Sequence, residues 1–550
     1  GYVWCNDLSL QFLQKDYLRA GQSVDQRVRE IALTAERILW KPGFAEKFVA
    51  YMKRGWFSLS TPVWTNFGTE RGLPISCYGS SILDTSESIL RAQAEVSMMT
   101  KHGGGTSVFL GHLRGRGADI QKGKNGQSSG SCHFARLFEN DITIWSQGST
   151  RRGNCSAYLP IDHPDIMEFL TFRSEGSPIQ DLSFGVCVPD YWMQEMIEGV
   201  GEHRKVWAKV LETRCNLGYP YIFFTGNANK GAADVYRDKG LWINHTNLCT
   251  EIMEPNSEEE SFVCCLASMN DFYFEEWEQV PDAVEVLTYL LDAVMTEFIN
   301  KAKLIPYMER AVRFAERHRA LGIGQIGYHS YLQSKMIPFE SMEAKWINTK
   351  IARTIHDQTY AASQQLADDY GEPELLLGYG RRNATLLAIA PTKSSAFILG
   401  QVSEAVEPHR SNYFVKDLAK GKFSIRNKQL EALLEIYHQN TEETWNSILK
   451  HSGSVQHLDF LTPHEKEVFK TFKEISPMEI ILQASQRQKW IDQGQSLNLM
   501  IDPKLTPIKD LNALIIRAWE LGLKSLYYQI SVNASQELSR SILTCSSCES

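Results

Sequence analysis

Short apolar segments alternate along this chain with stretches of helical periodicity, and this alternation restricts its fold more than any other feature. Runs rich in β-branched and aromatic residues occur at 106–110, 184–188 and 221–224, and amphipathic stretches occur at 86–100 and 282–301. Strands that alternate with helices favour parallel pairing, because each helix can carry the chain back to the same edge of a sheet. We therefore predict an α/β protein with parallel strands and helical crossovers.

The two ends of the chain depart from this pattern. Apolar residues recur at three- and four-residue spacing over 25–39 and 43–53, which predicts helices there. Further helices are predicted at 477–495 and 508–521, and the sequence after Tyr528 turns polar and rich in serine. We predict a helical region at 1–60, a large α/β domain at 61–529 and a mobile tail at 530–550.

Composition excludes several classes of protein. Of 550 residues, 43% are hydrophobic and 22% are charged, which is typical of a globular protein. The formal net charge of −8 argues against general binding to nucleic acid or to anionic membranes. No apolar run reaches the roughly 18 residues that cross a bilayer, and the first residues lack the apolar core of a signal peptide. A cytoplasmic location is expected.

Eleven cysteines occur in this chain. An odd number in a long chain without a signal peptide is a poor disulfide framework and a plausible set of reduced thiols. Most of them are expected to be small buried hydrophobic residues. A functional cysteine must therefore be recognised by its neighbours.

One such neighbourhood is the sequence His-Thr-Asn-Leu-Cys-Thr-Glu-Ile at 245–252. In an extended strand, alternate side chains share a face, so Asn247, Cys249 and Glu251 would project together into one pocket. This pattern places a redox-capable sulfur between a hydrogen-bonding amide and a potential general base. The alternative is an edge strand that carries a buried thiol.

Two further cysteines lie in suggestive surroundings. Cys77 follows Ser76, and Thr61 lies in the preceding hydroxyl-bearing segment. Cys264 and Cys265 lie in the apolar run 262–270, which we predict to be a strand. Adjacent residues of a strand point to opposite faces, so at most one of this pair can face a shared pocket. The alternative for Cys77 and Cys264 is that they fill the core.

Three more segments carry chemistry. The turn 390–396 follows the apolar segment 384–389, and its hydroxyls and N–H groups suit a phosphate; Thr and Ser also favour helix N-caps without any ligand. Tyr527 and Tyr528 are adjacent and could be ordinary strand aromatics. Cys545 and Cys548 form a Cys-x-x-Cys pair that could be half a zinc site, but no second pair lies nearby with suitable spacing.

In this order, these residues resemble the large, catalytic subunit of class I ribonucleotide reductases, from about residue 7 to the C-terminus. The resemblance implies a ten-stranded α/β barrel made of two five-stranded parallel halves, which would occupy 61–529, with a central finger loop that carries a radical cysteine. Cys249 matches this cysteine, and Asn247 and Glu251 match its neighbours. Cys77 and Cys264 match the pair that reduces the substrate.

The resemblance also implies roles for other residues. Tyr527 and Tyr528 match tyrosines that relay the radical, and the pair Cys545 and Cys548 matches the thiols that re-reduce the active site by exchange. The expected substrate-binding residues are Thr61, Ser76, Gly104, Gly105, Asn247, Glu251, Pro391, Thr392, Ser394 and Ser395. The expected effector-binding residues are Asp84, Arg114 and Arg151. Arg151 lies in the stretch 147–154, which resembles a loop that links the effector to base choice; a solvated basic turn is the alternative.

The resemblance further implies partners. The radical cofactor would come from a small β subunit, so no cofactor or metal is expected on this chain. Thioredoxin or glutaredoxin would supply electrons, ribonucleoside diphosphates would be the substrates, and ATP or deoxynucleoside triphosphates would be the effectors of a homodimer. Only sixty residues precede Thr61, so we expect this chain to lack an ATP-cone domain and its overall-activity switch.

Other classes of protein remain as alternatives. A class II reductase makes its thiyl radical with adenosylcobalamin and needs no second subunit; the pair Tyr527 and Tyr528 favours class I over it. The glycyl-radical class is disfavoured, because the C-terminus has no glycine in a suitable setting. A non-catalytic nucleotide-binding regulator would have no use for the thiols of Cys77, Cys249 and Cys264.

Overall fold

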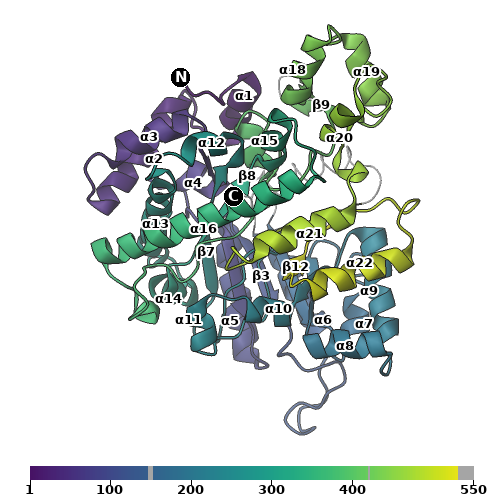
Figure 1. Cartoon of the computed structure of the whole chain (residues 1–550). Coiled ribbons are helices and arrows are strands. Elements are labelled where there is room, and N and C mark those ends of the chain that lie inside the picture. The colour runs from purple at the N-terminus through teal and green to yellow at the C-terminus, as the bar shows by residue number, and fades with distance from the viewer. Residues whose placement is uncertain (146–152, 419–420, 531–550) are drawn as a thin grey trace.

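The computed structural model describes residues 1–145, 153–418 and 421–530 (Figure 1). The predicted functional residues Arg151, Cys545 and Cys548 lie outside these residues. Among the described residues, no helix combines the length and the apolar character needed to cross a membrane.

Five parallel strands form the first half of a barrel. They pair in sequence order: β2 (Cys77–Ser81), β3 (Gly105–Phe109), β4 (Asn154–Pro160), β5 (Ser183–Val188) and β6 (Tyr221–Phe224). The helices that connect them are α5 (Ser86–Lys101), α6 (Ser131–Ile144), α7 (Ile166–Phe169), α8 (Asp190–Glu198) and α9 (His203–Leu217). These strands are buried along most of their length, as expected of parallel strands covered on both faces. The predicted runs at 106–110, 184–188 and 221–224 are confirmed as strands.

The second half is also parallel but less regular. Its first two strands are β7 (Phe262–Asn270) and β8 (Leu321–Ile326). Two extended segments follow, joined to β8 and to each other by single bridges at Ile323–Leu387 and Ile389–Gln495. The second of these segments continues into β11 (Leu499–Met500), which pairs with β13 (Gln529–Ile530) in the fifth extended segment. The intervening helices are α13 (Ala283–Ala302), α14 (Glu309–His318), α15 (Tyr328–Ser334), α16 (Met342–Tyr370), α17 (Lys393–Ile398), α21 (Pro477–Gln488) and α22 (Ile508–Glu520).

The two halves run antiparallel to each other and close at both junctions. At one junction β2 pairs with β7, and at the other β12 (Ser525–Leu526) pairs with β6. Because both edges are paired, the ten strands and extended segments of the two halves form a closed barrel with no free edge. The predicted barrel of two five-stranded parallel halves is therefore confirmed. β1 (Phe57–Leu59) pairs antiparallel with β7 as an addition to the barrel.

The N-terminal helices pack against one side of the barrel, where Figure 1 shows them in purple. They are α1 (Asp7–Asp16), α2 (Val24–Leu39), α3 (Phe44–Lys53) and α4 (Thr61–Asn66). In α2, Ser23 and Gln26 form a capping box, and the fully buried Val28, Ile31 and Ala35 recur at helical spacing. The predicted helices at 25–39 and 43–53 are confirmed.

The predicted helix at 477–495 is too long. α21 ends at Gln488, because the following residues are drawn into the barrel, where the Gln493 amide donates to the Leu387 carbonyl. A second feature that the sequence did not indicate is a small lobe with its own apolar core around Leu430, Trp445 and Phe469. Its elements are β9 (Tyr413–Leu418), β10 (Gly421–Arg426), α18 (Lys428–Ile436), α19 (Glu442–Lys450) and α20 (Pro463–Val468), at the upper right of Figure 1.

The remaining elements are short connecting helices. They are α10 (Thr225–Lys230), α11 (Asp234–Asp238), α12 (Phe274–Trp277) and the 3₁₀ turns at Asp271–Tyr273, Glu374–Leu376 and Phe472–Glu474. α10 and α11 lead from the last strand of the first half towards the segment 241–256, which carries Cys249. This segment is the link between the two halves of the barrel.

Candidate active site

The segment around Cys249 is a loop with a tight turn, so the prediction of an extended strand is wrong. Thr250 has a φ of +70°, and its amide donates to the Asn247 carbonyl at 3.3 Å. The Asn247 amide in turn donates to the Ile252 carbonyl at 3.3 Å. Some backbone N–H and C=O groups of the loop thus bond to each other, so they do not require a neighbouring strand as partner. The finger loop implied by the family resemblance describes this segment better.

Side chains from the first half of the barrel hold this loop. Ser107 on β3 donates to the Thr246 carbonyl at 2.7 Å, and its oxygen lies 3.1 Å from His245 Nδ1. Tyr158 on β4 donates to the Asn247 carbonyl at 3.3 Å. All of these residues are almost fully buried, and burial lowers the pKa of His245 to about 3, so its imidazole is neutral. The loop therefore lies inside the barrel, fixed by neutral hydrogen bonds.

The turn still brings together the amide and the carboxyl predicted from the sequence. Asn247 Nδ2 donates to Glu251 Oε1 at 3.0 Å, and Ser496 Oγ donates to Glu251 Oε2 at 3.0 Å. Burial raises the pKa of Glu251 to about 7, although these hydrogen bonds oppose the shift. A carboxyl with a pKa near neutrality can both accept and return a proton at physiological pH. The same Ser496 hydroxyl oxygen lies 2.5 Å from the Cys249 carbonyl oxygen, so this hydroxyl contacts both the thiol-bearing residue and Glu251.

Cys77 and Cys264 lie directly opposite each other across the β2–β7 junction. Side chains at directly opposed antiparallel positions have Cβ atoms about 4.5–5.5 Å apart, and a disulfide needs about 3.5–4.5 Å. A small adjustment would therefore allow the two sulfurs to bond. Cys265, the next residue, lies on the other face, where burial raises the pKa of its thiol and Arg319 and Asp292 are the nearby charged groups. The prediction that only one of this adjacent pair shares the pocket agrees with this register.

The finger loop and the cysteine pair are in contact. Asn247 Nδ2 lies 4.0 Å from Cys77 Sγ, and Gln493 Nε2 donates to Cys264 Sγ at 3.6 Å. Burial, followed by the neighbouring Glu254, raises the pKa of Cys264 well above its usual value. The thiol of Cys264 is therefore protonated at neutral pH. The fold places Cys77, Cys249 and Cys264 around one region of the barrel interior.

Among the predicted substrate residues, Ser76, Gly104 and Gly105 lie beside Cys77, and Thr61 lies at the N-terminal helices. Gly105 is the register partner of Cys77, and its amide donates to the Ser76 carbonyl at 2.7 Å. A Cβ on Gly104 would lie 2.5 Å from the ring of Tyr78, so packing alone requires glycine there. Thr61, at the start of α4, is buried, and its hydroxyl lies 3.1 Å from that of Tyr17. The close packing against Tyr78 thus explains why residue 104 is a glycine, and the sequence alone did not reveal this reason.

The turn at Pro391–Ser395 lies next to the N-terminal helices. Thr392 precedes α17, but its hydroxyl makes no cap bond and instead accepts from the Ala405 amide at 2.8 Å. The alternative interpretation of this threonine side chain as a helix N-cap is therefore wrong. Phe12 on α1 stacks with Tyr17 and contacts Phe397 on α17 at a ring-centroid distance of 5.1 Å. The turn and Thr61 therefore lie on the same side of the barrel, because both contact α1 or the residue that follows it.

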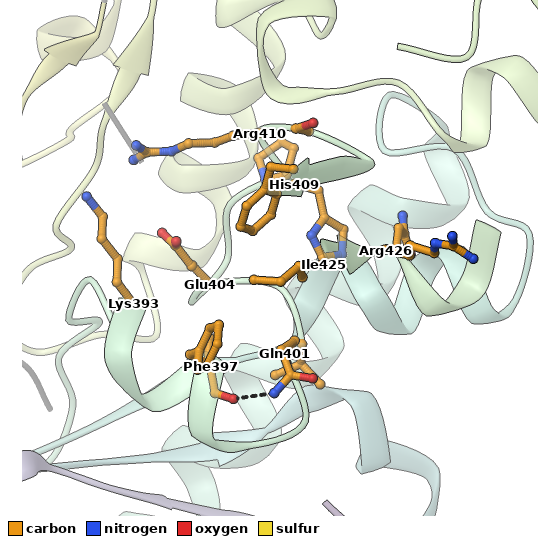
Figure 2. A pocket seen from close by; sticks show the side chains of 14 residues that line it. Lys393, Phe397, Gln401, Glu404, His409, Arg410, Ile425 and Arg426 are labelled. Atoms are coloured by element: carbon orange, nitrogen blue, oxygen red, sulfur yellow. Dashed lines mark hydrogen bonds between the residues drawn. The ribbon is translucent and has the colours of Figure 1, made fainter. Parts of the chain in front are cut away.

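A pocket opens beside this turn, and Figure 2 shows its lining. Lys393, Arg410 and the Glu404 carboxylate extend to the same side of the pocket. The Arg410 side chain is 3% exposed, and its nitrogens make no hydrogen bond within the described part of the chain. Its nearest carboxylate oxygen belongs to Glu407, at 3.8 Å. Neither cation was singled out from the sequence: Lys393, the first residue of α17, lies within the turn predicted to suit a phosphate, and Arg410 is an isolated basic residue without a distinguishing pattern.

The predicted effector residues Asp84 and Arg114 also come together. They follow β2 and β3, and Arg114 Nε donates to Asp84 Oδ2 at 2.6 Å. The pair lies just beyond the end of β2, whereas Cys77 begins that strand. Seven residues of nearly extended chain span roughly 20 Å. The expected effector position is thus at the opposite end of the strand from the thiols.

Tyr527 and Tyr528 connect the barrel interior with its surface. Tyr527 is 1% exposed and belongs to the same apolar cluster as Cys249. Tyr528 is half-buried, and the two ring centroids are 4.3 Å apart. The two tyrosine rings are therefore in contact, and they form a short path from the surface towards the finger loop.

Comparison with known families identifies this architecture. A family model described as "Ribonucleotide reductase, barrel domain" matches residues 75–203, 197–376 and 373–529. A second, described as "Ribonucleotide reductase, all-alpha domain", matches residues 3–72. The chain belongs to the ribonucleotide reductase family.

Several relatives of this reductase are large subunits. The putative ribonucleoside-diphosphate reductase large subunit of Frog virus 3 is 37% identical over 510 residues, which cover 89% of this chain and 88% of the relative. The large subunit of Invertebrate iridescent virus 3 is 33% identical over 600 residues, with coverage of 95% and 93%. Among solved structures, the Actinobacillus ureae class Id ribonucleotide reductase alpha subunit matches with a TM-score of 0.92 and 51% identity, covering 99% of each chain.

These matches also distinguish between the two reductase classes considered from the sequence. The 51% identity over 99% of both chains is to a class I alpha subunit. The reductase is therefore a class I large subunit, an oxidoreductase, and the adenosylcobalamin-dependent alternative is set aside. A large subunit of this class works with a small subunit.

Proposed function

We propose that this reductase converts ribonucleoside diphosphates to 2′-deoxyribonucleoside diphosphates by thiyl-radical chemistry at Cys249. The observation that carries the proposal is the arrangement inside the barrel. The loop that carries Cys249 also carries a carboxyl with a pKa of about 7, and its Asn247 contacts one of two cysteines paired across the β2–β7 junction. Radical reduction of an alcohol needs these three functions: a hydrogen-abstracting sulfur, a base and a two-electron reductant.

The first step would be removal of hydrogen from C3′. The Cys249 thiyl radical takes the 3′-hydrogen atom, which forms an S–H bond and leaves a radical at C3′. Glu251 accepts the proton of the 3′-hydroxyl as general base, and Asn247 holds the substrate by a hydrogen bond. The hydrogen bond between Asn247 and Glu251 supports this division of roles, because it keeps both groups at one substrate position.

The cysteine pair would complete the reduction. The 2′-hydroxyl leaves as water with a proton from the Cys77–Cys264 dithiol, and the pair then supplies one further proton and two electrons. A C2′–H bond replaces the C2′–O bond, and the two sulfurs join as a disulfide. Cys249 finally returns the hydrogen atom to C3′ and becomes a thiyl radical again, and Glu251 returns its proton to the 3′-oxygen, so neither residue is consumed.

The substrate diphosphate would bind in the pocket that contains Lys393 and Arg410. Ser496 bonds Glu251, and Asn498, two residues further on, donates to Glu407 at 2.7 Å, beside Arg410. Two residues of extended chain span about 6–7 Å, which is comparable with the reach from a ribose ring to its terminal phosphate. The incompletely bonded guanidinium offers paired donors to that phosphate. The hydroxyls of Thr392, Ser394 and Ser395 and the backbone at Pro391 would line the near side, and Thr61, Ser76, Gly104 and Gly105 would hold the ribose.

Other parts of the proposal concern supply and regulation. The radical would come from the partner small subunit through Tyr528 and Tyr527. Cys545 and Cys548 would re-reduce the active-site disulfide and be reduced by thioredoxin or glutaredoxin in the cytoplasm. Cys545 lies seventeen positions after Tyr528, and a flexible chain of that length would span roughly 20–25 Å, which is enough for a swinging arm. Asp84, Arg114 and Arg151 would bind a nucleoside triphosphate effector at a homodimer interface.

A reduction assay with CDP tests this function. We expect deoxy-CDP only when a cognate small subunit is present, with thioredoxin as reductant, and no effect of adenosylcobalamin. Product formation without the small subunit, or dependent on cobalamin, would contradict the proposal. Absence of product with the small subunit present would also contradict it, provided that radical content of the small subunit is verified by spectroscopy.

A further inference from the structure

Four tyrosines, rather than the two expected, form a continuous cluster at the closing junction of the barrel. Tyr219 and Tyr221 flank the start of β6 and pack against Tyr527 and Tyr528. The ring centroids of Tyr219 and Tyr528 are 5.2 Å apart, and those of Tyr221 and Tyr527 are 4.9 Å apart. The cluster thus extends the expected relay by two aromatic residues.

One of the additional tyrosines is joined to the relay by a hydrogen bond. The hydroxyl oxygens of Tyr219 and Tyr528 are 3.1 Å apart, and either can donate to the other. A hydroxyl–hydroxyl contact of this length allows a proton to move between the two phenols, while the ring contact provides the path for an electron. Tyr219 and Tyr528 are both half-buried, whereas Tyr527 is 1% exposed. Tyr219 therefore lies with Tyr528 at the half-buried end of the cluster, and Tyr527 forms its buried end.

The surroundings of Tyr219 are also distinctive. The Arg173 guanidinium lies over its ring, 4.6 Å from the centroid, and donates to its hydroxyl at 3.2 Å. Ser183 Oγ lies 3.3 Å from the same hydroxyl. A cation over an aromatic face is attracted to the electron-rich neutral ring, so removal of an electron from Tyr219 costs more than from an otherwise equal phenol. If Tyr219 were oxidised, it would consequently take an electron from Tyr528, so the radical would pass on to Tyr528.

We propose that Tyr219 is a third redox-active tyrosine of this reductase, which receives the oxidising equivalent and passes it to Tyr528. This inference rests on the proposed radical relay through Tyr528 and Tyr527. The radical on the partner small subunit takes one electron and one proton from Tyr219, which becomes a neutral tyrosyl radical. Tyr219 then recovers one electron and one proton from Tyr528 across the hydroxyl contact. Each transfer moves one hydrogen equivalent, so no further oxidant or base is consumed.

The substitution Tyr219→Phe tests this role, because it keeps the ring and removes the oxidisable hydroxyl. We expect CDP reduction with the small subunit to fall to background, while affinities for CDP and for the small subunit stay unchanged. The matched control is Ser183→Ala, which removes another hydrogen-bonding partner of the same hydroxyl but leaves the phenol in place; it should retain most of the activity. Wild-type turnover in Tyr219→Phe would overturn the inference.

A second variant separates a redox role from a role in positioning Tyr528. Replacement of Tyr219 by 3-aminotyrosine keeps the hydroxyl and its hydrogen bonds but creates an easily oxidised trap. On mixing with the small subunit, CDP and ATP, we expect an aminotyrosyl radical at position 219 by electron paramagnetic resonance. A radical trapped by 3-aminotyrosine at position 528 but never at 219 would overturn the inference and leave the proposed relay intact. Failure to trap a radical at either position, with no CDP reduction by the wild type, would overturn both.

Discussion

The two ends of strand β2 show how differently the same fold treats its functional groups. At the beginning of the strand, Cys77 is 4% exposed and lies opposite the buried Cys264. Just beyond the end of the strand, the side chains of Asp84 and Arg114 are 30% and 32% exposed and pair with each other. Inside the barrel, burial shifts the pKa of thiols and carboxyls; at the outer end, water screens the charges. The interior is therefore suited to chemistry and the outer end to reversible binding.

The largest effect is expected at the interior, from Cys249→Ser. An alcohol cannot form an oxygen radical under conditions that oxidise a thiol, so CDP reduction should fall by at least about three orders of magnitude. Deoxy-CDP formation in the presence of the small subunit measures this. If the serine variant turned over at an appreciable fraction of the wild-type rate, Cys249 would not be the radical-bearing residue, and the barrel interior would not be shown to perform the chemistry.

Removal of the tail thiols should stop turnover without stopping the chemistry. Cys545→Ser combined with Cys548→Ser leaves the interior dithiol in place, so prereduced enzyme should make about one equivalent of product and then stall with thioredoxin. Rapid-quench measurement of deoxy-CDP per chain distinguishes the single turnover from the steady state. Sustained turnover with thioredoxin would exclude the tail from the cycle.

Glu251→Gln should reduce activity by about 10²–10⁴-fold, the usual contribution of a general base. Because the pKa of Glu251 is raised to about 7, the basic carboxylate form increases as pH rises through 7. The wild-type profile of kcat/KM against pH should rise through this value, and the residual activity of the variant should lack the same limb. An unchanged profile in the variant would assign the limb to another group.

The same substitution should also change stability. The folded-state pKa of Glu251 is about 7 against an ordinary value of 4.5, so its favourable contribution is present below pH 4.5 and is lost as pH rises through 7. This shift corresponds to about 3 kcal/mol. Denaturant unfolding should therefore show Glu251→Gln gaining about this much relative to wild type between pH 4 and pH 8. A constant difference across this range would mean that the carboxyl is not desolvated.

The smallest effect on stability is expected at the outer end. Arg114→Ala removes an ion pair that is about one-third exposed, so the free energy of unfolding should change by less than about 1 kcal/mol. The response of CDP reduction to effector triphosphates should nevertheless be weakened, whereas the basal rate should persist. Comparison of activity with and without effector separates the two quantities. Loss of basal activity in a folded variant would place Arg114 with the interior.

The sequence by itself predicted the residues of the candidate active site, and it determined which segments form regular structure. Alternation of apolar and amphipathic runs is a local property, and it predicted the strands at 184–188 and 221–224 and the helix at 508–521. The set of Asn247, Cys249 and Glu251 could be recognised because the residue types and their spacing are themselves the signal. The extended conformation assigned to that set was wrong, since the turn at Thr250 depends on contacts inside the barrel.

Only the tertiary structure decided how these residues meet. The opposition of Cys77 and Cys264, 187 positions apart, arises because two parallel half-sheets join antiparallel at the β2–β7 junction. The contacts of Ser107, Tyr158 and Ser496 with the finger loop, and of Tyr219 with Tyr528, likewise join distant segments. No local pattern encodes such contacts, because they follow from barrel closure and from the burial that closure imposes. Burial in turn sets the pKa of Glu251, a property that its sequence neighbours do not reveal.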